Sequence, residues 1–138
     1  MSLSYSKVGA AYKKTQTQSV VEVADPHAVV LAMLDELLKA MRAFANNADL
    51  KAGGDREVKS KSFARSLTII YALQSSLDFE KGGDIANNLF QLYEYARQQL
   101  LKDMREAKGD NTQEAMPPLT EIRDAWEQMR EGGLPEQD

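Results

Sequence analysis

Histidine is the side chain best suited to acid–base or metal chemistry near neutral pH, and the chain has only one, His27. A di-iron carboxylate bundle needs two Glu-x-x-His pairs, but the residue three positions before His27 is Ala24. A Ser-His-Asp or zinc site would have to bring every partner of His27 from other elements. Cysteine is absent, which excludes disulfides and thiolate ligands. We therefore expect His27 to be a surface residue in the first turn of a helix, and we expect no metal, no cofactor and no enzymatic activity.

Three carboxylates, Asp78, Glu80 and Asp84, cluster around the pair Gly82 and Gly83. Two nearby carboxylates could act as a general acid and a general base. Acidic residues and glycines are, however, also the ordinary residues of turns and helix caps. The glycine pair lacks the lysine and the serine or threonine of a phosphate-binding loop. We interpret this stretch as helix punctuation.

The bulk properties exclude two classes of partner. The 138 residues favour one domain that is long enough to bury a core, and the formal net charge is −4. Because the basic residues are scattered and not gathered on one face, we expect no binding to nucleic acid. The chain contains no apolar run of the ~20 residues that cross a bilayer, and its first residues lack an apolar signal core. We expect a cytoplasmic protein without membrane insertion.

Two helices are predicted in the first half of the chain. Asp25 and Pro26 are an N-cap residue followed by proline at the first helical position. The apolar residues that follow alternate at spacings of four and three, as in a helix with a heptad-like seam: Val30, Leu34, Leu37, Met41, Phe44 and Ala48. Gly53 and Gly54 should end this helix. A second helix is predicted over about 56–76, with an apolar face of Phe63, Leu67, Ile70, Leu73 and Leu77.

A third helix is predicted from Asp84, as its N-cap, to about Ala107, with Gly82 and Gly83 separating it from the second. Its apolar residues form two adjacent rows, which are Ile85, Leu89, Leu92 and Ala96, and Ala86, Phe90, Tyr93, Leu100 and Met104. Two rows predict a broad face that contacts two neighbouring helices.

The last helix carries Leu119, Ile122, Trp126 and Met129 at helical spacing. Pro117 and Pro118 either start this helix or kink a longer one that begins near Asn111. We expect Trp126 to be largely buried against the third helix.

These elements predict an all-α fold, an antiparallel four-helix bundle over 25–131. The bundle is preceded by an N-terminal arm or short extra helix in 1–24, and it is followed by a polar tail, 132–138. The arm carries Tyr5, Val8 and Tyr12 at positions i, i+3 and i+7.

The aromatic side chains divide into two groups. Most lie in the apolar stripes, where core packing is the expected role: Phe44, Phe63, Phe90, Tyr93 and Trp126. Tyr95 is two positions from Tyr93, so it cannot share its direction on a helix and must face a second helix or the surface. Tyr5 and Tyr12 lie on a weakly predicted segment. These tyrosines could contact something other than the bundle core.

The stretch "SSLDFEKGGDIANNLFQLYEYARQQLL", residues 75–101, resembles the signature of the flagellar secretion chaperone family FliS, with its Ser-Leu-Asp loop, Gly-Gly pair and Leu-Tyr-acid-Tyr run. Other parts are similar to the family in the same order. "AAY" ending at Tyr12 resembles its tyrosine-bearing arm, "VADP" over 23–26 the segment before its first long helix, and "EIRDAWEQM" over 121–129 its C-terminal helix.

The chain also departs from the family pattern. Asp25 stands where serine or threonine is usual, which keeps the N-cap chemistry. Leu34 and Glu36 stand where tyrosine and glycine are common, and Ala96 where methionine is frequent. The first helix should therefore present a less aromatic and more acidic surface to a partner.

The resemblance implies a cytosolic export chaperone that binds the disordered C-terminal segment of flagellin, prevents its premature polymerisation and hands it to the flagellar export apparatus. The export gate and a second copy of the chain are further candidate partners. The alternative is a helical-bundle adaptor for another protein. The residues we expect to contact a partner are Tyr5, Val8, Tyr12, Leu67, Phe90, Tyr93 and Tyr95. Whether the arm is a lid over the site or part of it is left open by the sequence.

Overall fold

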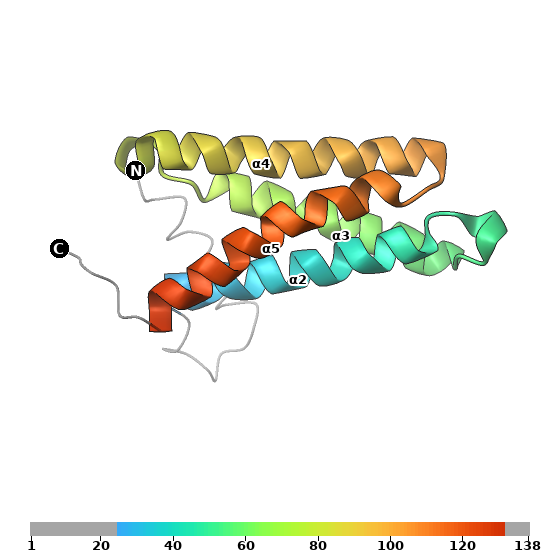
Figure 1. The fold of residues 1–138 in the computed structure, drawn as a ribbon, viewed down its shortest axis with the longest axis horizontal. Coiled ribbons are helices and arrows are strands. Elements are labelled where there is room, and N and C mark those ends of the chain that lie inside the picture. The colour runs from blue at the N-terminus through green and yellow to red at the C-terminus, as the bar shows by residue number, and fades with distance from the viewer. Residues whose placement is uncertain (1–24, 132–138) are drawn as a thin grey trace.

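The structure is a computed structural model that describes residues 25–131. The expected arm and polar tail therefore lie outside the described residues. Within 25–131 the chain forms four α-helices and one 3-10 helix, with no strand: α2 (Pro26–Asn47), η2 (Leu50–Ala52), α3 (Arg56–Ser75), α4 (Phe79–Glu106) and α5 (Asp110–Glu131). The helices pack against each other, which confirms the predicted all-α four-helix bundle (Figure 1).

The start of α2 follows the cap predicted from the sequence. Asp25 has an extended backbone, and its carboxylate accepts a hydrogen bond from the amide of Ala28 at 2.7 Å. Pro26 occupies the first helical turn, where its missing N–H costs nothing. The apolar stripe of α2 then supplies the largest share of the core.

A compact turn joins α2 to α3. The Asp49 carboxylate accepts hydrogen bonds from the amides of Lys51 and Ala52, and so caps η2. Gly53 then adopts a φ of 102°, a left-handed conformation that strains any residue with a Cβ. Asp55 begins α3 by accepting a hydrogen bond from the amide of Val58 at 3.0 Å. The chain therefore reverses within a few residues, and α3 packs along α2.

The start of α4 corrects one sequence prediction. Asp78, not Asp84, is the N-cap, because its carboxylate accepts hydrogen bonds from the amides of Glu80 and Lys81, each at 3.1 Å. The glycine pair follows the short first turn of α4, and it separates that turn from the long remainder of α4 and not α3 from α4. Gly83 leaves helical geometry, with φ 49° and ψ −123°, so the short first turn joins the rest of α4 at a kink. Only glycine takes this conformation without steric cost.

The structure also decides between the two predictions for the last helix. α5 begins at Asp110 and passes through Pro117 and Pro118, so it is the longer helix that was predicted to contain the prolines. Its beginning is anchored to α4 by Asp103, whose fully buried carboxylate accepts hydrogen bonds from the amide of Thr112 at 2.6 Å and from the side chain of Asn111 at 2.9 Å. This carboxylate compensates the unpaired N–H groups at the start of α5.

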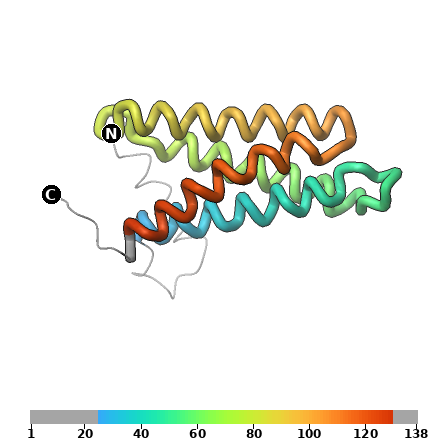
Figure 2. Tube along the Cα trace, in the orientation of Figure 1, coloured from blue at the N-terminus to red at the C-terminus, as the bar shows by residue number. Residues whose placement is uncertain are grey.

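The core lies between α2, α3 and α5, and it is closed by one face of α4. Its largest fully buried apolar side chains are Phe44, Leu34, Leu37, Met41, Ile70, Leu73, Leu100 and Leu119. α5 crosses the bundle obliquely, from the C-terminal end of α4 to the N-terminal end of α2 (Figures 1 and 2). The beginning of α2 and the end of α5 therefore lie side by side, while α5 and the beginning of α4 diverge.

Candidate functional site

The divergence of α4 and α5 leaves an apolar pocket of about 330 Å³ at this end of the bundle. All four described α-helices contribute to its wall. The apolar lining residues are Val30 of α2, Leu73 of α3, Leu77 in the turn after α3, Ile85, Ala86, Leu89 and Tyr93 of α4, and Trp126 of α5. Almost all of the lining is carbon. A concave apolar surface of this kind is a binding site for apolar side chains, because it carries few groups that could orient or transform a polar substrate.

Ile85 is the most unusual member of the pocket wall. Its side chain is 70% exposed, although it belongs to an apolar row that the sequence predicts to be packed. The helix periodicity places Ile85 on the same side of α4 as Leu89. Among the described helices, α5 diverges from the beginning of α4, the part that carries Ile85 (Figure 1). An isoleucine exposed beside an apolar pocket indicates a surface that a partner can cover.

Trp126 forms the α5 wall of the pocket, and it is held by the first turn of α2. Its indole Nε1 donates a hydrogen bond to the backbone carbonyl of His27 at 3.0 Å. The imidazole of His27 stacks on the indole, with ring centroids 4.9 Å apart and planes 13° apart. One expectation is therefore wrong: His27 is a partly buried packing residue and not a surface one. Trp126 packs against the core, with its indole N–H bonded to α2 and its ring in the pocket wall beside residues of α4.

The charged residues of the pocket lining are one acid and one base. Asp78 and Lys81 lie in its lining, and the exposed carboxylates of Glu80 and Asp84 follow on the same short segment. The hydrogen bond from the backbone amide of Lys81 is the main reason why the pKa of Asp78 is below its ordinary value. Asp78 thus acts as a helix cap, as interpreted from the sequence. The pocket combines an apolar floor with an edge that carries one acidic and one basic residue.

The structure separates the residues that the sequence singled out on α4. Tyr93 lines the pocket from the core side and is 2% exposed. Phe90 does not line the pocket, and its ring packs against Phe79 in the first turn of α4, with centroids 6.0 Å apart. Tyr95 is 41% exposed and lies outside the pocket. Of the two positions predicted for it, against a second helix or on the surface, the structure shows the surface position.

The remaining predicted contact residues do not join the pocket lining within the described structure. Leu67 of α3 packs against the core and is partly buried. Tyr5, Val8 and Tyr12 lie outside the described residues. Among the described residues, the pocket therefore gathers only Tyr93 from the predicted set.

Sequence reasoning missed most of the pocket wall. Val30, Leu73, Leu77, Ile85 and Leu89 were all assigned to apolar stripes, and nothing in their spacing distinguishes a pocket wall from a packed seam. The one usable signal was the presence of two apolar rows on α4, which predicted more apolar surface than one neighbour can cover.

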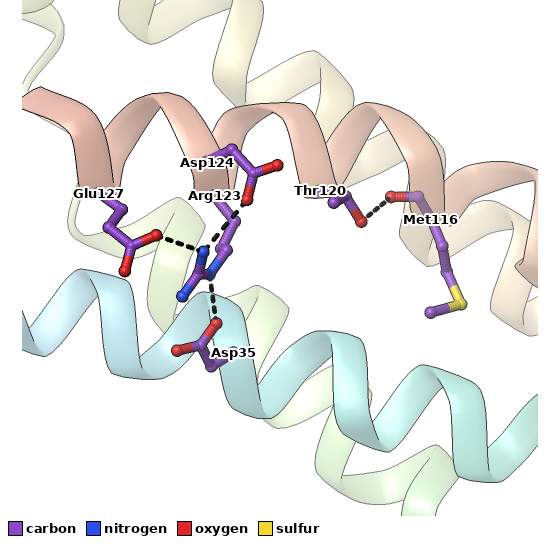
Figure 3. A network of polar contacts seen from close by, with 6 residues as sticks. All are labelled: Asp35, Met116, Thr120, Arg123, Asp124 and Glu127. Atoms are coloured by element: carbon purple, nitrogen blue, oxygen red, sulfur yellow. Dashed lines mark hydrogen bonds and ion pairs between the residues drawn. The ribbon is translucent and has the colours of Figure 1, made fainter.

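A polar network centred on Arg123 of α5 joins α5 to α2 (Figure 3). Nε of Arg123 contacts Oδ1 of Asp35 on α2 at 2.6 Å, and Nη1 contacts Glu127 at 2.7 Å and Asp124 at 3.1 Å. These carboxylates, with Asp35 first, raise the pKa of Arg123 above its ordinary value. Thr120 on the same helix donates a hydrogen bond from its hydroxyl to the carbonyl of Met116 at 3.0 Å.

A second polar cluster joins α3 to α4. Gln74 donates hydrogen bonds to the Phe90 carbonyl at 3.4 Å and to the Glu94 carboxylate at 3.3 Å. Arg97 donates two hydrogen bonds to Glu94, at 2.7 and 3.0 Å, and these are the main reason why the pKa of Glu94 falls to about 2. Both ions are partly exposed, so the cluster positions the two helices and adds little free energy.

Within 25–131 no group of three or more histidine, aspartate or glutamate side chains is placed to hold a metal ion. None of the helices in this part of the chain is long and apolar enough to span a bilayer.

Comparison with known proteins gives one consistent family. The family model described as "Flagellar protein FliS" matches residues 8–133. The flagellar secretion chaperone FliS of Vibrio cholerae is 31% identical over 119 residues, which cover 86% of this chain and 85% of that protein. The protein of the same name from Salmonella typhimurium is 31% identical over 123 residues, 86% of this chain and 87% of that protein. The flagellar secretion chaperone FliSB of Pseudomonas aeruginosa is 25% identical over 119 residues, 84% of this chain and 90% of that protein.

Proposed function

This chain belongs to the FliS family of flagellar secretion chaperones, and from that premise we propose that it is a cytosolic, non-enzymatic chaperone for flagellin. It binds the disordered C-terminal segment of flagellin before export, prevents that segment from polymerising in the cytosol, and releases it at the flagellar export apparatus. No cofactor takes part in this cycle, since binding and release are the whole of the proposed activity.

The observation that carries the proposal is the open apolar pocket beside the exposed side chain of Ile85. An assembly-competent segment of flagellin must bury apolar side chains, either in a filament or in a chaperone. An amphipathic helix laid along a groove does this through apolar residues spaced by three or four. The pocket supplies the complementary surface, with Ile85, Leu89 and Trp126 on its wall and Tyr93 at its floor.

Release is as important as binding for an export chaperone. A disordered segment that folds on binding loses conformational entropy, which lowers the affinity for a given contact area. Asp78 and Lys81 in the lining keep the pocket edge hydrated and limit the apolar area that a partner can cover. The complex is therefore specific without being permanent.

The partner surface extends beyond the pocket in this proposal. Leu67, Phe90 and Tyr95 do not line the pocket, so a segment that also reaches them has to extend beyond it. The arm residues Tyr5, Val8 and Tyr12 act as a weakly bound cover of the same apolar surface. A second copy of the chain and the export gate remain further proposed partners.

Calorimetric titration with full-length flagellin, with flagellin lacking its C-terminal segment, and with a peptide of that segment tests the proposal. We expect the full-length protein and the peptide to bind with about one chaperone per flagellin and a negative heat-capacity change, the mark of apolar burial. The truncated flagellin should not bind. If neither full-length flagellin nor the peptide binds, the chaperone proposal is wrong, and the adaptor for another protein becomes the function to test.

A further inference from the structure

The two halves of α5 differ in how firmly they are held. The first half, before the prolines, is anchored by the Asp103 cap and contains the buried residues Thr112, Ala115 and Met116. Leu119, directly after the prolines, is the one buried side chain among the described residues of the second half. In the second half, none of the residues from 120 to 129 is fully buried. Few buried contacts are the structural condition for local opening of a segment.

Two prolines separate these halves. Pro117 and Pro118 have no N–H, so the carbonyls of Gln113 and Glu114 lose the donors that an uninterrupted helix would supply. Thr120 also directs its hydroxyl to the carbonyl of Met116, a type of contact that bends helices. The backbone is therefore easiest to bend at the point where the anchored half ends.

Two polar contacts from the second half to α2 are prominent. One is the ion pair of Arg123 with Asp35 at 2.6 Å (Figure 3). The other is the hydrogen bond from the Trp126 indole to the carbonyl of His27 at 3.0 Å. Breaking the ion pair leaves no isolated charge, since Arg123 keeps Asp124 and Glu127 on its own helix and Asp35 is half-exposed to water. Opening this contact is consequently cheap.

The pocket admits apolar side chains of the partner segment, and its width depends on the position of α5. Trp126 is the only α5 residue in the described lining, so moving the second half of α5 removes that wall and widens the site toward α4.

From these four observations, and resting on the proposed function, we infer that the second half of α5, residues 119–131, is a gate of the apolar pocket. Pro117 and Pro118 are its hinge, and Arg123 is its latch on Asp35. The gate opens before the flagellin segment enters, and its open population limits the rate of association.

Amide hydrogen exchange of the full chain without partner tests the gate directly. In Arg123→Met the latch is lost while the length of the side chain is kept. A surface ion pair contributes about 0.5–1 kcal/mol, so the exchange rate in 119–131 should rise about two- to five-fold. Pro117→Ala with Pro118→Ala restores two backbone donors, and exchange in 119–131 should become slower than in the wild type.

Arg65→Met is the matched control, because Arg65 of α3 makes a comparable ion pair at 3.3 Å with Glu36, the residue next to Asp35. It should leave exchange in 119–131 unchanged, and residues 110–116 serve as an internal reference for global destabilisation. Asp35→Asn breaks the latch from the other side and should match Arg123→Met. The gate is refuted if Arg123→Met and Arg65→Met have the same effect on 119–131, or if the double alanine variant does not slow exchange there.

Stopped-flow association with full-length flagellin then links the gate to function. We expect Arg123→Met to accelerate association and the double alanine variant to slow it, with smaller changes in dissociation. Altered exchange with unaltered association would show that the segment opens but does not gate the pocket. If wild-type chain does not bind flagellin at all, the proposed function fails, while the exchange result still decides whether the hinge and latch exist.

Discussion

Replacing Ile85 by alanine tests the pocket as a partner-binding surface with little effect on the fold. The side chain is 70% exposed in the free chain, so most of its apolar area is available to a partner. Ile85→Ala removes three carbon atoms, worth ~0.8 kcal/mol each when fully buried, or about 2.4 kcal/mol in all. Multiplying by the exposed fraction gives about 1.7 kcal/mol of lost binding free energy.

That loss corresponds to an increase in the dissociation constant of about 15- to 20-fold. The free energy of unfolding should fall by no more than about 0.7 kcal/mol, because only the part of the Ile85 side chain that is already buried in the free chain contributes to folding. Calorimetry with a peptide of the flagellin C-terminal segment measures the first quantity, and a urea titration measures the second. The two measurements together separate a lost contact from a damaged fold.

Tyr71→Ala is the control for this experiment. Tyr71 of α3 is 72% exposed, nearly the same as Ile85, and it does not line the pocket. Its replacement should leave the dissociation constant unchanged. If Ile85→Ala weakens binding less than about three-fold, or if Tyr71→Ala weakens it as much, the pocket is not the contact surface and the reasoning from exposed apolar area is refuted.

Three further predictions concern stability and the arm. Trp126→Ala should lower the free energy of unfolding, measured by urea titration, by about 2–3 kcal/mol. This is less than the 3–5 kcal/mol of a fully buried tryptophan, because the indole is half-buried. In the same assay Trp126→Phe should lower it by about 1 kcal/mol, for the lost hydrogen bond. The pKa of Glu94 is lowered from 4.5 to about 2 in the folded chain, so its contribution to stability is complete above pH 4.5 and is lost as the pH falls toward 2. The difference in the free energy of unfolding between wild type and Glu94→Gln, measured by urea titration at each pH, should therefore shrink over this range. Deleting residues 1–18 should tighten flagellin binding by up to about ten-fold in calorimetry, the factor expected if the arm covers the site in about nine molecules of ten.

Each of these predictions has a contrary result. A cost near zero for Trp126→Ala would mean that the contact between α5 and the first turn of α2 does not form in solution. A pH-independent difference for Glu94→Gln would mean that the ion pair with Arg97 is not formed. Weaker binding after deletion of 1–18 would make the arm part of the partner surface and not a lid, and unchanged binding would remove Tyr5 and Tyr12 from the site.

The helices and their order could be predicted from the sequence because local interactions decide them. Asp25 with Pro26 marked the start of α2, and Gly53 and Gly54 marked the turn before α3, since caps and left-handed turns depend on a few neighbouring residues. The family signature over 75–101 is also a local string, and the family match confirmed it. The one misplaced boundary, at α4, arose because both Asp78 and Asp84 are suitable caps.

The site depends on distances across the bundle, which local patterns do not contain. The helical period gives the direction of a side chain relative to its own axis, but it does not say whether another helix lies opposite. Ile85 and Leu100 lie in the two adjacent apolar rows of α4, yet one is exposed and the other fully buried, because α5 crosses close to the end of α4 and diverges from its beginning. The pocket exists only because of that crossing.

The same reason explains why the position of His27 was misjudged. His27 and Trp126 are 99 positions apart, and only the return of α5 to the start of α2 brings their rings into contact. The sequence by itself determined the helices, their caps and the family of this chain, because these follow from short-range chemistry. The tertiary structure alone decided which apolar side chains became core and which became a pocket wall, because burial is a property of the neighbours that folding brings together.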